Sequence, residues 1–135
     1  ALHSIATSRA RMGFSMTPAE NAAYPRVPQA MVRTHRGSGR KSIYTASHAG
    51  EIVDMDQTQA EILLERVMAH ATQRQFVYIH RWRVNDLVVW DNKCTLHRGR
   101  PFDDLRWPRD AQRATSLDIA PTCDQENLMP REAAE

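Results

Sequence analysis

The chain has 135 residues, which favours a single domain, and its net charge of +2 is too small to indicate binding to nucleic acid or to an anionic membrane surface. No apolar run approaches the roughly 20 residues that a membrane span needs. The only two cysteines, Cys94 and Cys123, do not sit in a Cys-x-x-Cys pair, so we expect neither a disulfide framework nor a cysteine zinc site. Together with the lack of a signal-peptide pattern at the N-terminus, they predict a reducing, cytoplasmic location.

The N-terminal third is predicted to contain little regular structure before a hairpin. Residues 1–12 have the composition of the end of a helix whose start is missing. Residues 15–28 hold three prolines, which favour an ordered loop or a lid over a continuous element. Residues 30–34 and 41–46 alternate as strands do, and the Gly-Ser-Gly run at 37–39 predicts a tight hairpin between them.

One long helix is predicted over residues 58–72. Apolar residues recur there at helical spacing, namely Ala60, Leu63, Leu64, Val67, Met68 and Ala71. Thr58 followed by Glu61 has the pattern of a capping box, which marks the helix start. We expect the apolar stripe to pack on the outer face of a sheet.

The remaining sequence predicts strands. Segments 76–82, 86–91, 93–98 and 110–117 are rich in β-branched and aromatic residues or alternate in polarity, and polar turns separate them. Phe76, Trp82 and Trp90 are expected in a sandwich core, and Cys94 is expected to be a small buried hydrophobe. Residues 119–135 are polar and acidic, which predicts a flexible tail. The fold class is therefore mainly β with one long helix.

The candidate functional residues follow the alternating apolar run that ends at Trp90. His97 ends the next predicted strand, where its ring would be held at a fixed angle, and Asp91 with Asn92 is expected to form the turn before it. Arg109 and Arg113 share one face of the last predicted strand, because side chains alternate with period two. A guanidinium fork matches a carboxylate through two hydrogen bonds, so this face could clamp anions; taken alone, two such arginines are more often solvated. We expect structural roles for the other histidines, which lie in loops, at strand ends or late in the helix.

Several runs of the sequence carry a family resemblance. WDNKCTLHRG at 90–99, followed by RDAQRAT at 109–115, resembles the C-terminal signature of the iron(II)/2-oxoglutarate dioxygenases of the taurine dioxygenase/TfdA type. VRTHRGSGRKSIY at 32–44, AHATQRQFVYIHRW at 69–82 and NDLVVWDN at 85–92 resemble the same family in the same order. The resemblance implies a partial jelly roll of the double-stranded β-helix, cupin-like kind, with residues 1–135 forming the C-terminal half of one domain.

The resemblance also implies the chemistry. Such enzymes hold Fe(2+) through two histidines and one carboxylate, and take 2-oxoglutarate and O2 as co-substrates. His97 corresponds to the far iron-binding histidine, Arg109 to the partner of the distal carboxylate of 2-oxoglutarate, and Arg113 to the partner of the substrate anion. The implied substrate is an aryloxyacetate such as 2,4-dichlorophenoxyacetate or a sulfonate such as taurine.

The sequence departs from the family in one respect. None of its six histidines is followed two residues later by Asp or Glu, so the His-x-Asp half of the iron site is missing from these residues. Two alternatives therefore stay open beside a dioxygenase half: a non-catalytic, anion-binding barrel remnant, and an incomplete fragment that is inactive on its own. Exposed barrel edges in a half-domain would also favour a homo-oligomer.

Overall fold

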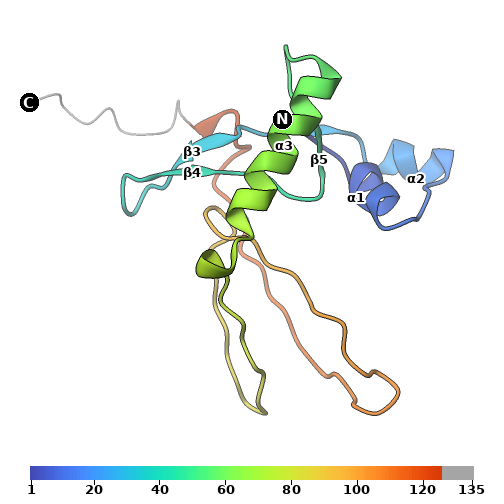
Figure 1. Cartoon of the computed structure of the whole chain (residues 1–135), viewed down its shortest axis with the longest axis vertical. Coiled ribbons are helices and arrows are strands. Elements are labelled where there is room, and N and C mark those ends of the chain that lie inside the picture. The colour runs from blue at the N-terminus through green and yellow to red at the C-terminus, as the bar shows by residue number, and fades with distance from the viewer. Residues whose placement is uncertain (126–135) are drawn as a thin grey trace, which may run out of the picture.

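The computed structural model describes residues 1–125, and its regular elements lie in the first 76 of them. In chain order these are β1 (Leu2–His3), α1 (Ile5–Arg11), α2 (Pro18–Ala23), β2 (Val27–Pro28), β3 (Val32–Thr34), β4 (Lys41–Ile43), β5 (Ala49–Glu51), α3 (Gln57–Ala71) and the 3-10 helix η1 (Arg74–Phe76). Figure 1 shows α3 beside the small sheets and two long excursions of the later chain reaching away from them.

The strands form two small sheets. One has the order β2-β1-β5, and the other pairs β3 with β4. The second is the predicted hairpin: Val32 pairs with Ile43 and Thr34 with Lys41 in an antiparallel register. Gly39 has a φ of +65°, a conformation that a glycine adopts without a steric cost, so this part of the prediction is confirmed.

The two N-terminal helices correct the predictions for residues 1–28. Helix α1 begins within the chain, because the Ser4 side chain accepts a hydrogen bond from the Ala6 amide at 3.1 Å and caps it. The prolines do not prevent α2, because Pro18 occupies the first turn, where its missing N–H has no partner to lose. Thr17 and Glu20 form a capping box there, with the Thr17 amide donating to Glu20 at 2.8 Å.

Helix α3 matches the predicted long helix, but its cap and its buried face differ in detail. Asp56, and not Thr58, is the N-cap: its carboxylate accepts from the amides of Thr58 and Gln59 at 3.0 and 3.2 Å. Ala60 and Leu64 are buried and the helix contacts β5, whereas Leu63 is 37% exposed, so the apolar stripe is narrower than predicted. None of the helices in residues 1–125 has the length and apolar character that a bilayer crossing needs.

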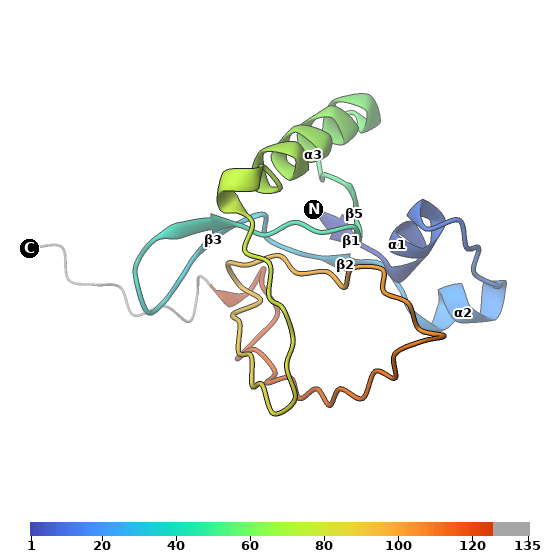
Figure 2. The same cartoon turned by 60° about the horizontal axis from the view of Figure 1, so that its bottom comes forward.

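The four predicted strands between residues 76 and 117 are not formed in the described part of the chain. Apart from η1, residues 76–117 are extended or turning, without ladder pairing. The two excursions turn at residues 84–85 and 104–106, and Figure 2 shows both on the side of the sheets away from α3. β-propensity reports the fit of a side chain to a pleated surface, but a strand also needs a neighbouring backbone, which these segments lack here.

The apolar side chains of these excursions are correspondingly exposed. The predicted core positions Phe76, Trp82 and Trp90 are 57%, 63% and 36% exposed, which contradicts the prediction that they are buried. Leu87 and Val89 are 87% and 85% exposed. These segments therefore contribute no buried core among the described residues.

Asp118 ties the end of the second excursion to the β3–β4 hairpin. Its carboxylate accepts from Arg33 at 2.8 Å and from Lys93 at 2.9 Å. Partial burial opposes ionisation of Asp118, but hydrogen bonds from Lys93, Gln125 and Arg33 outweigh it and hold its pKa well below the ordinary value. The predicted tail, 119–135, is described as far as Gln125, and the Thr122 hydroxyl in it accepts from the Ala30 amide at 3.0 Å. The rest of that segment lies outside the described residues.

Candidate metal and anion site around His97

A hydrogen-bonded turn at residues 91–95 precedes His97. The Asp91 side chain accepts from the Lys93 amide at 2.8 Å, and the Asp91 carbonyl accepts from the Thr95 hydroxyl at 2.6 Å. Asn92 accepts from the indole N–H of Trp90 at 2.8 Å. The prediction that side-chain-to-backbone bonds make this turn is confirmed for Asp91, whereas the Asn92 side chain bonds to the side chain of Trp90 instead.

The His97 ring packs against an aromatic neighbour. Its centroid lies 4.8 Å from that of Trp90, with the two planes at 49°. His97 is exposed in this structure. Because Trp90 is itself fixed by its bond to Asn92, the turn and the indole together restrict the direction of the imidazole.

Arg109 folds back onto the segment that directly follows His97. Its guanidinium carbon lies 5.7 Å from the ring centroid of Phe102. One of its terminal nitrogens lies 3.8 Å from the position that a Cβ on Gly99 would take. The structure therefore places the Arg109 cation beside a residue two positions after the candidate metal ligand.

Arg113 has no comparable anchor. It is exposed and makes no hydrogen bond or ion pair with residues 1–125. Since residues 110–117 do not form a strand here, the shared face predicted for Arg109 and Arg113 is not established by backbone pairing. The joint action of His97, Arg109 and Arg113 stays a prediction.

The described residues do not supply a complete set of iron ligands at His97. Within residues 1–125, one group places three potential ligand atoms within 4.8 Å of one another, and it consists of His35, Asp91 and Cys94. His97 is not part of this group. The chain thus offers one imidazole at the predicted position, which is not the three-ligand face that iron(II) oxygenases use.

Sequence reasoning missed the grouping of His35, Asp91 and Cys94. We expected His35 to have a structural role in a loop or at a strand end, Asp91 to lie in a turn, and Cys94 to be a buried hydrophobe. Cys94 is exposed and lies in a turn, and the strand that was predicted to contain it, 93–98, is not formed. His35 and Asp91 are 56 residues apart, and no local pattern in the sequence signals their contact.

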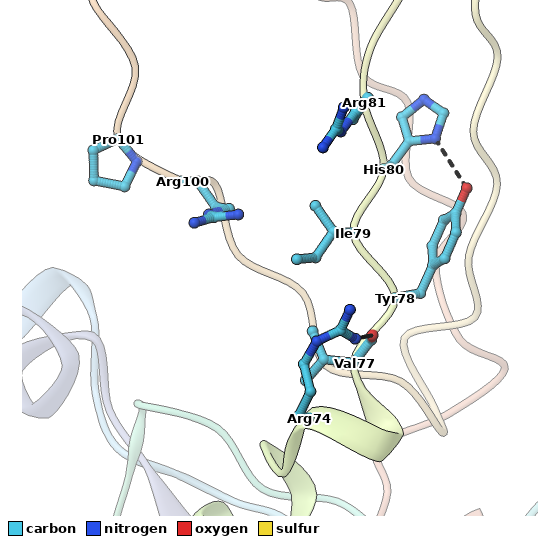
Figure 3. Close-up of a pocket in the computed structure, with 8 residues that line it drawn as sticks. All are labelled: Arg74, Val77, Tyr78, Ile79, His80, Arg81, Arg100 and Pro101. Atoms are coloured by element: carbon cyan, nitrogen blue, oxygen red, sulfur yellow. Dashed lines mark hydrogen bonds between the residues drawn. The ribbon is translucent and has the colours of Figure 1, made fainter.

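An open cavity lies elsewhere, along the first excursion. It is lined by Arg74, Val77, Tyr78, Ile79, His80, Arg81, Arg100 and Pro101. Figure 3 shows Arg100 and Pro101 on one side of the opening and Ile79 and Arg81 on the other. His97, Arg109 and Arg113 do not line it, so this cavity is not the predicted site.

Comparisons with known proteins identify the family. The sequence model described as "Taurine catabolism dioxygenase TauD, TfdA family" matches residues 1–115. The alpha-ketoglutarate-dependent 2,4-dichlorophenoxyacetate dioxygenase of Cupriavidus pinatubonensis is 48% identical over 76% of this chain and 35% of its own length. The (S)-phenoxypropionate/alpha-ketoglutarate-dioxygenase of Delftia acidovorans is 38% identical over 74% of this chain and 32% of its own length.

A solved structure agrees with the sequence relatives. The crystal structure of AAD-2 in complex with Mn(II) and N-oxalylglycine is similar with a TM-score of 0.83 and 44% identity, over 90% of this chain and 48% of that one. The chain thus spans about a third of the curated relatives and about half of this solved chain. A family match over residues 1–115 covers all three predicted site residues, and the chain belongs to the TauD/TfdA family of dioxygenases.

Proposed function

We propose that this chain is the C-terminal half of an iron(II)- and 2-oxoglutarate-dependent dioxygenase that hydroxylates a small anionic substrate, with aryloxyalkanoates favoured over sulfonates. The observation that carries the proposal is the family match, which runs through His97, Arg109 and Arg113. Two relatives, 48% and 38% identical, are named for a phenoxyacetate and a phenoxypropionate. These names favour an aryl ether with a carboxylate over a sulfonate.

The roles of the three residues follow from their chemistry. His97 would provide one neutral imidazole to iron(II), oriented by its contact with Trp90. Arg109 would pair with the distal carboxylate of 2-oxoglutarate, and its position beside Gly99 supports this assignment, since it brings a cation close to the His97 segment. Arg113 would pair with the substrate carboxylate.

A bound analogue in a similar structure supports the co-substrate. AAD-2 was solved with Mn(II) and N-oxalylglycine, a molecule with the same pair of terminal carboxylates as 2-oxoglutarate. One bidentate arginine suits the distal carboxylate of either molecule. Iron(II), when bound by a complete ligand set, supplies the redox chemistry with O2; because this chain offers one such ligand at His97, no chemical step follows from its residues alone.

The half-domain assignment explains the unformed strands. Residues 77–117 have strand-like composition, follow extended paths, and expose apolar side chains such as Leu87 and Val89. In a jelly roll the strands of one half pair with strands of the other half, which would satisfy these backbones and cover these side chains. We propose that a preceding segment carrying the His-x-Asp ligands supplies those strands. The two free cysteines suit a cytoplasmic enzyme.

Succinate release tests the function most simply. The protein that includes the upstream reading frame is incubated with iron(II), 2-oxoglutarate, O2 and one of three acids: 2,4-dichlorophenoxyacetate, 2-phenoxypropionate or taurine. We expect substrate-dependent succinate from the two aryloxy acids and little from taurine. Faster turnover of taurine would overturn the substrate assignment. Activity with none of the three acids would favour the non-catalytic barrel. The observation that supports this alternative is the lack of a His-x-Asp motif in these residues.

A further inference from the structure

His35, Asp91 and Cys94 form a second cluster of metal-binding side chains, separate from His97. His35 begins the turn between β3 and β4, whereas Asp91 and Cys94 lie in the turn before His97. The Nε2 atom of His35 is 3.0 Å from a carboxylate oxygen of Asp91. The Sγ atom of Cys94 lies within 4.8 Å of both ligand atoms. Three different donor types thus meet at one place from two distant segments.

The ring of His35 is held from both of its nitrogens. Its Nδ1 atom shares a hydrogen bond of 2.9 Å with the Ser38 hydroxyl, and its Nε2–H donates to the Asp91 carboxylate at 3.0 Å. A metal ion at Nε2 would take the place of that proton, and Nδ1–H would then donate to Ser38. Histidines that bind metals nearly always use their second nitrogen in this way, because the outer partner fixes the ring and its tautomer. Ser38 lies in the same turn, so the hairpin itself provides the orientation.

The other two groups are also prepared for a cation. The Asp91 carboxylate accepts a hydrogen bond from the Lys93 amide at 2.8 Å, which fixes its position in the turn. Cys94 is exposed and free, and its sulfur lies 3.9 Å from the Asp91 carbonyl, within the same turn. Exposure gives a metal access to the thiol and gives the leaving proton a path to water.

The spacing is close to that of a tetrahedral site. With bonds of about 2.0–2.3 Å to nitrogen, oxygen and sulfur, ligand atoms around Zn²⁺ stand roughly 3.3–3.8 Å apart. The His35–Asp91 gap of 3.0 Å would open slightly, and the wider separations, at most 4.8 Å, would close by about 1 Å. Rotation of partly exposed side chains can supply such shifts without moving the backbone.

We propose that His35, Asp91 and Cys94 bind a Zn²⁺ ion, with water as the fourth ligand. On binding, the Cys94 thiol loses its proton to water, and the ring proton of His35 moves from Nε2 to Nδ1. A thiolate with an imidazole selects Zn²⁺ over the oxygen-preferring Mg²⁺ and Ca²⁺. The ion would join the β3–β4 turn to the turn that carries His97. This site is distinct from the iron site proposed above, because it shares no ligand with it.

Cobalt provides a direct test with the 135-residue chain. Co²⁺ occupies zinc sites and gives a near-ultraviolet absorption when a thiolate binds it. We expect this band on titration of the reduced chain under anaerobic conditions, and its loss when Zn²⁺, the tighter binder, is added. Cys94→Ser should abolish the band, and His35→Gln should weaken Co²⁺ binding at least about tenfold, the lower limit for losing even an outer partner.

Matched variants separate this site from the alternatives. Cys123→Ser removes the other exposed thiol and should leave the band intact, as should His97→Ala, which affects only the proposed iron ligand. In the unmodified chain, Zn²⁺ should shift the NMR signals of the His35 ring, a readout that needs no variant to fold. Retention of the band in Cys94→Ser, its loss in Cys123→Ser, or no band at a hundredfold excess of Co²⁺ would overturn the proposal.

Discussion

Replacing Asp118 by asparagine should loosen the attachment of residues 118–125 to the hairpin. Asp118 accepts from Arg33, whose side chain is 8% exposed, and from Lys93, whose side chain is 38% exposed. A hydrogen bond to a nearly buried charge contributes about 1.5–3 kcal/mol, and the more exposed pair about 0–1 kcal/mol. The sum of about 1.5–4 kcal/mol would raise the open population on the order of 10- to 700-fold, at about 1.4 kcal/mol per tenfold.

The amide of Ala30 reports this opening. It donates to the Thr122 hydroxyl at 3.0 Å, so it becomes exchangeable when residues 118–125 detach. Residue-resolved hydrogen exchange, corrected for the intrinsic rate, should show a loss of Ala30 protection in Asp118→Asn. Asp104→Asn is the control, because Asp104 is exposed and makes no hydrogen bond or ion pair with residues 1–125. Unchanged Ala30 protection in Asp118→Asn, or an equal loss in the control, would refute the reasoning.

The pH dependence gives the same prediction a second check. Folding lowers the pKa of Asp118. Its contribution to the attachment of residues 118–125 is therefore fully present above the unfolded pKa of about 3.9, and it is lost as the pH falls through the folded pKa. The difference in Ala30 opening free energy between the unmodified protein and Asp118→Asn should therefore keep its neutral-pH size from about pH 5 to 7. It should shrink below about pH 4. A difference that grew on acidification would contradict the assigned ionisation.

Three further predictions concern α3, the arginines and the N-terminal strand. Leu64→Ala should lower the free energy of unfolding by about 2–5 kcal/mol in denaturant titration, because Leu64 is 4% exposed. Leu63→Ala, at a position 37% exposed, should lower it much less. Equal losses would mean that the buried face of α3 has been assigned wrongly. In the complete protein, Arg109→Ala should raise the 2-oxoglutarate requirement more than the substrate requirement, and Arg113→Ala the reverse; a swapped pattern in steady-state kinetics would exchange their roles. Burial lowers the pKa of His3 to about 4, so the stability that neutral His3 provides is present above about pH 6.5 and is lost as the pH falls towards 4. His3→Phe, which retains the stack on Tyr44, should remove this pH-dependent fall in melting temperature.

The sequence predicted local structure best where a segment satisfies its own backbone. The α3 periodicity and the glycines of the β3–β4 turn were sufficient, since a helix and a tight hairpin bond within themselves. The cap of α3 lies two residues earlier than predicted, because the Asp56 carboxylate accepts from the Thr58 and Gln59 amides and so brings Thr58 into the first turn.

Contacts between segments that lie far apart in the chain could not be predicted from the sequence patterns. Residues 86–91 and 93–98 have the composition of strands, but their partners cannot be read from composition, and the described chain provides none. The contact of His35 with Asp91 and that of Arg33 with Asp118 join segments 56 and 85 residues apart, so only coordinates reveal them. The candidate site residues His97, Arg109 and Arg113 stay predictions that rest on the spacing of the family motif, because residues 110–117 do not form the strand that was expected to position the arginines.

The central claim is that His97 binds iron together with chelated 2-oxoglutarate. Anaerobic addition of iron(II) and 2-oxoglutarate, followed by visible absorption spectroscopy, tests it most directly. We predict a charge-transfer band for the protein with its upstream half, no band for residues 1–135 alone, and no band for His97→Ala in the complete protein. A band of full intensity in that variant would contradict the assignment of His97.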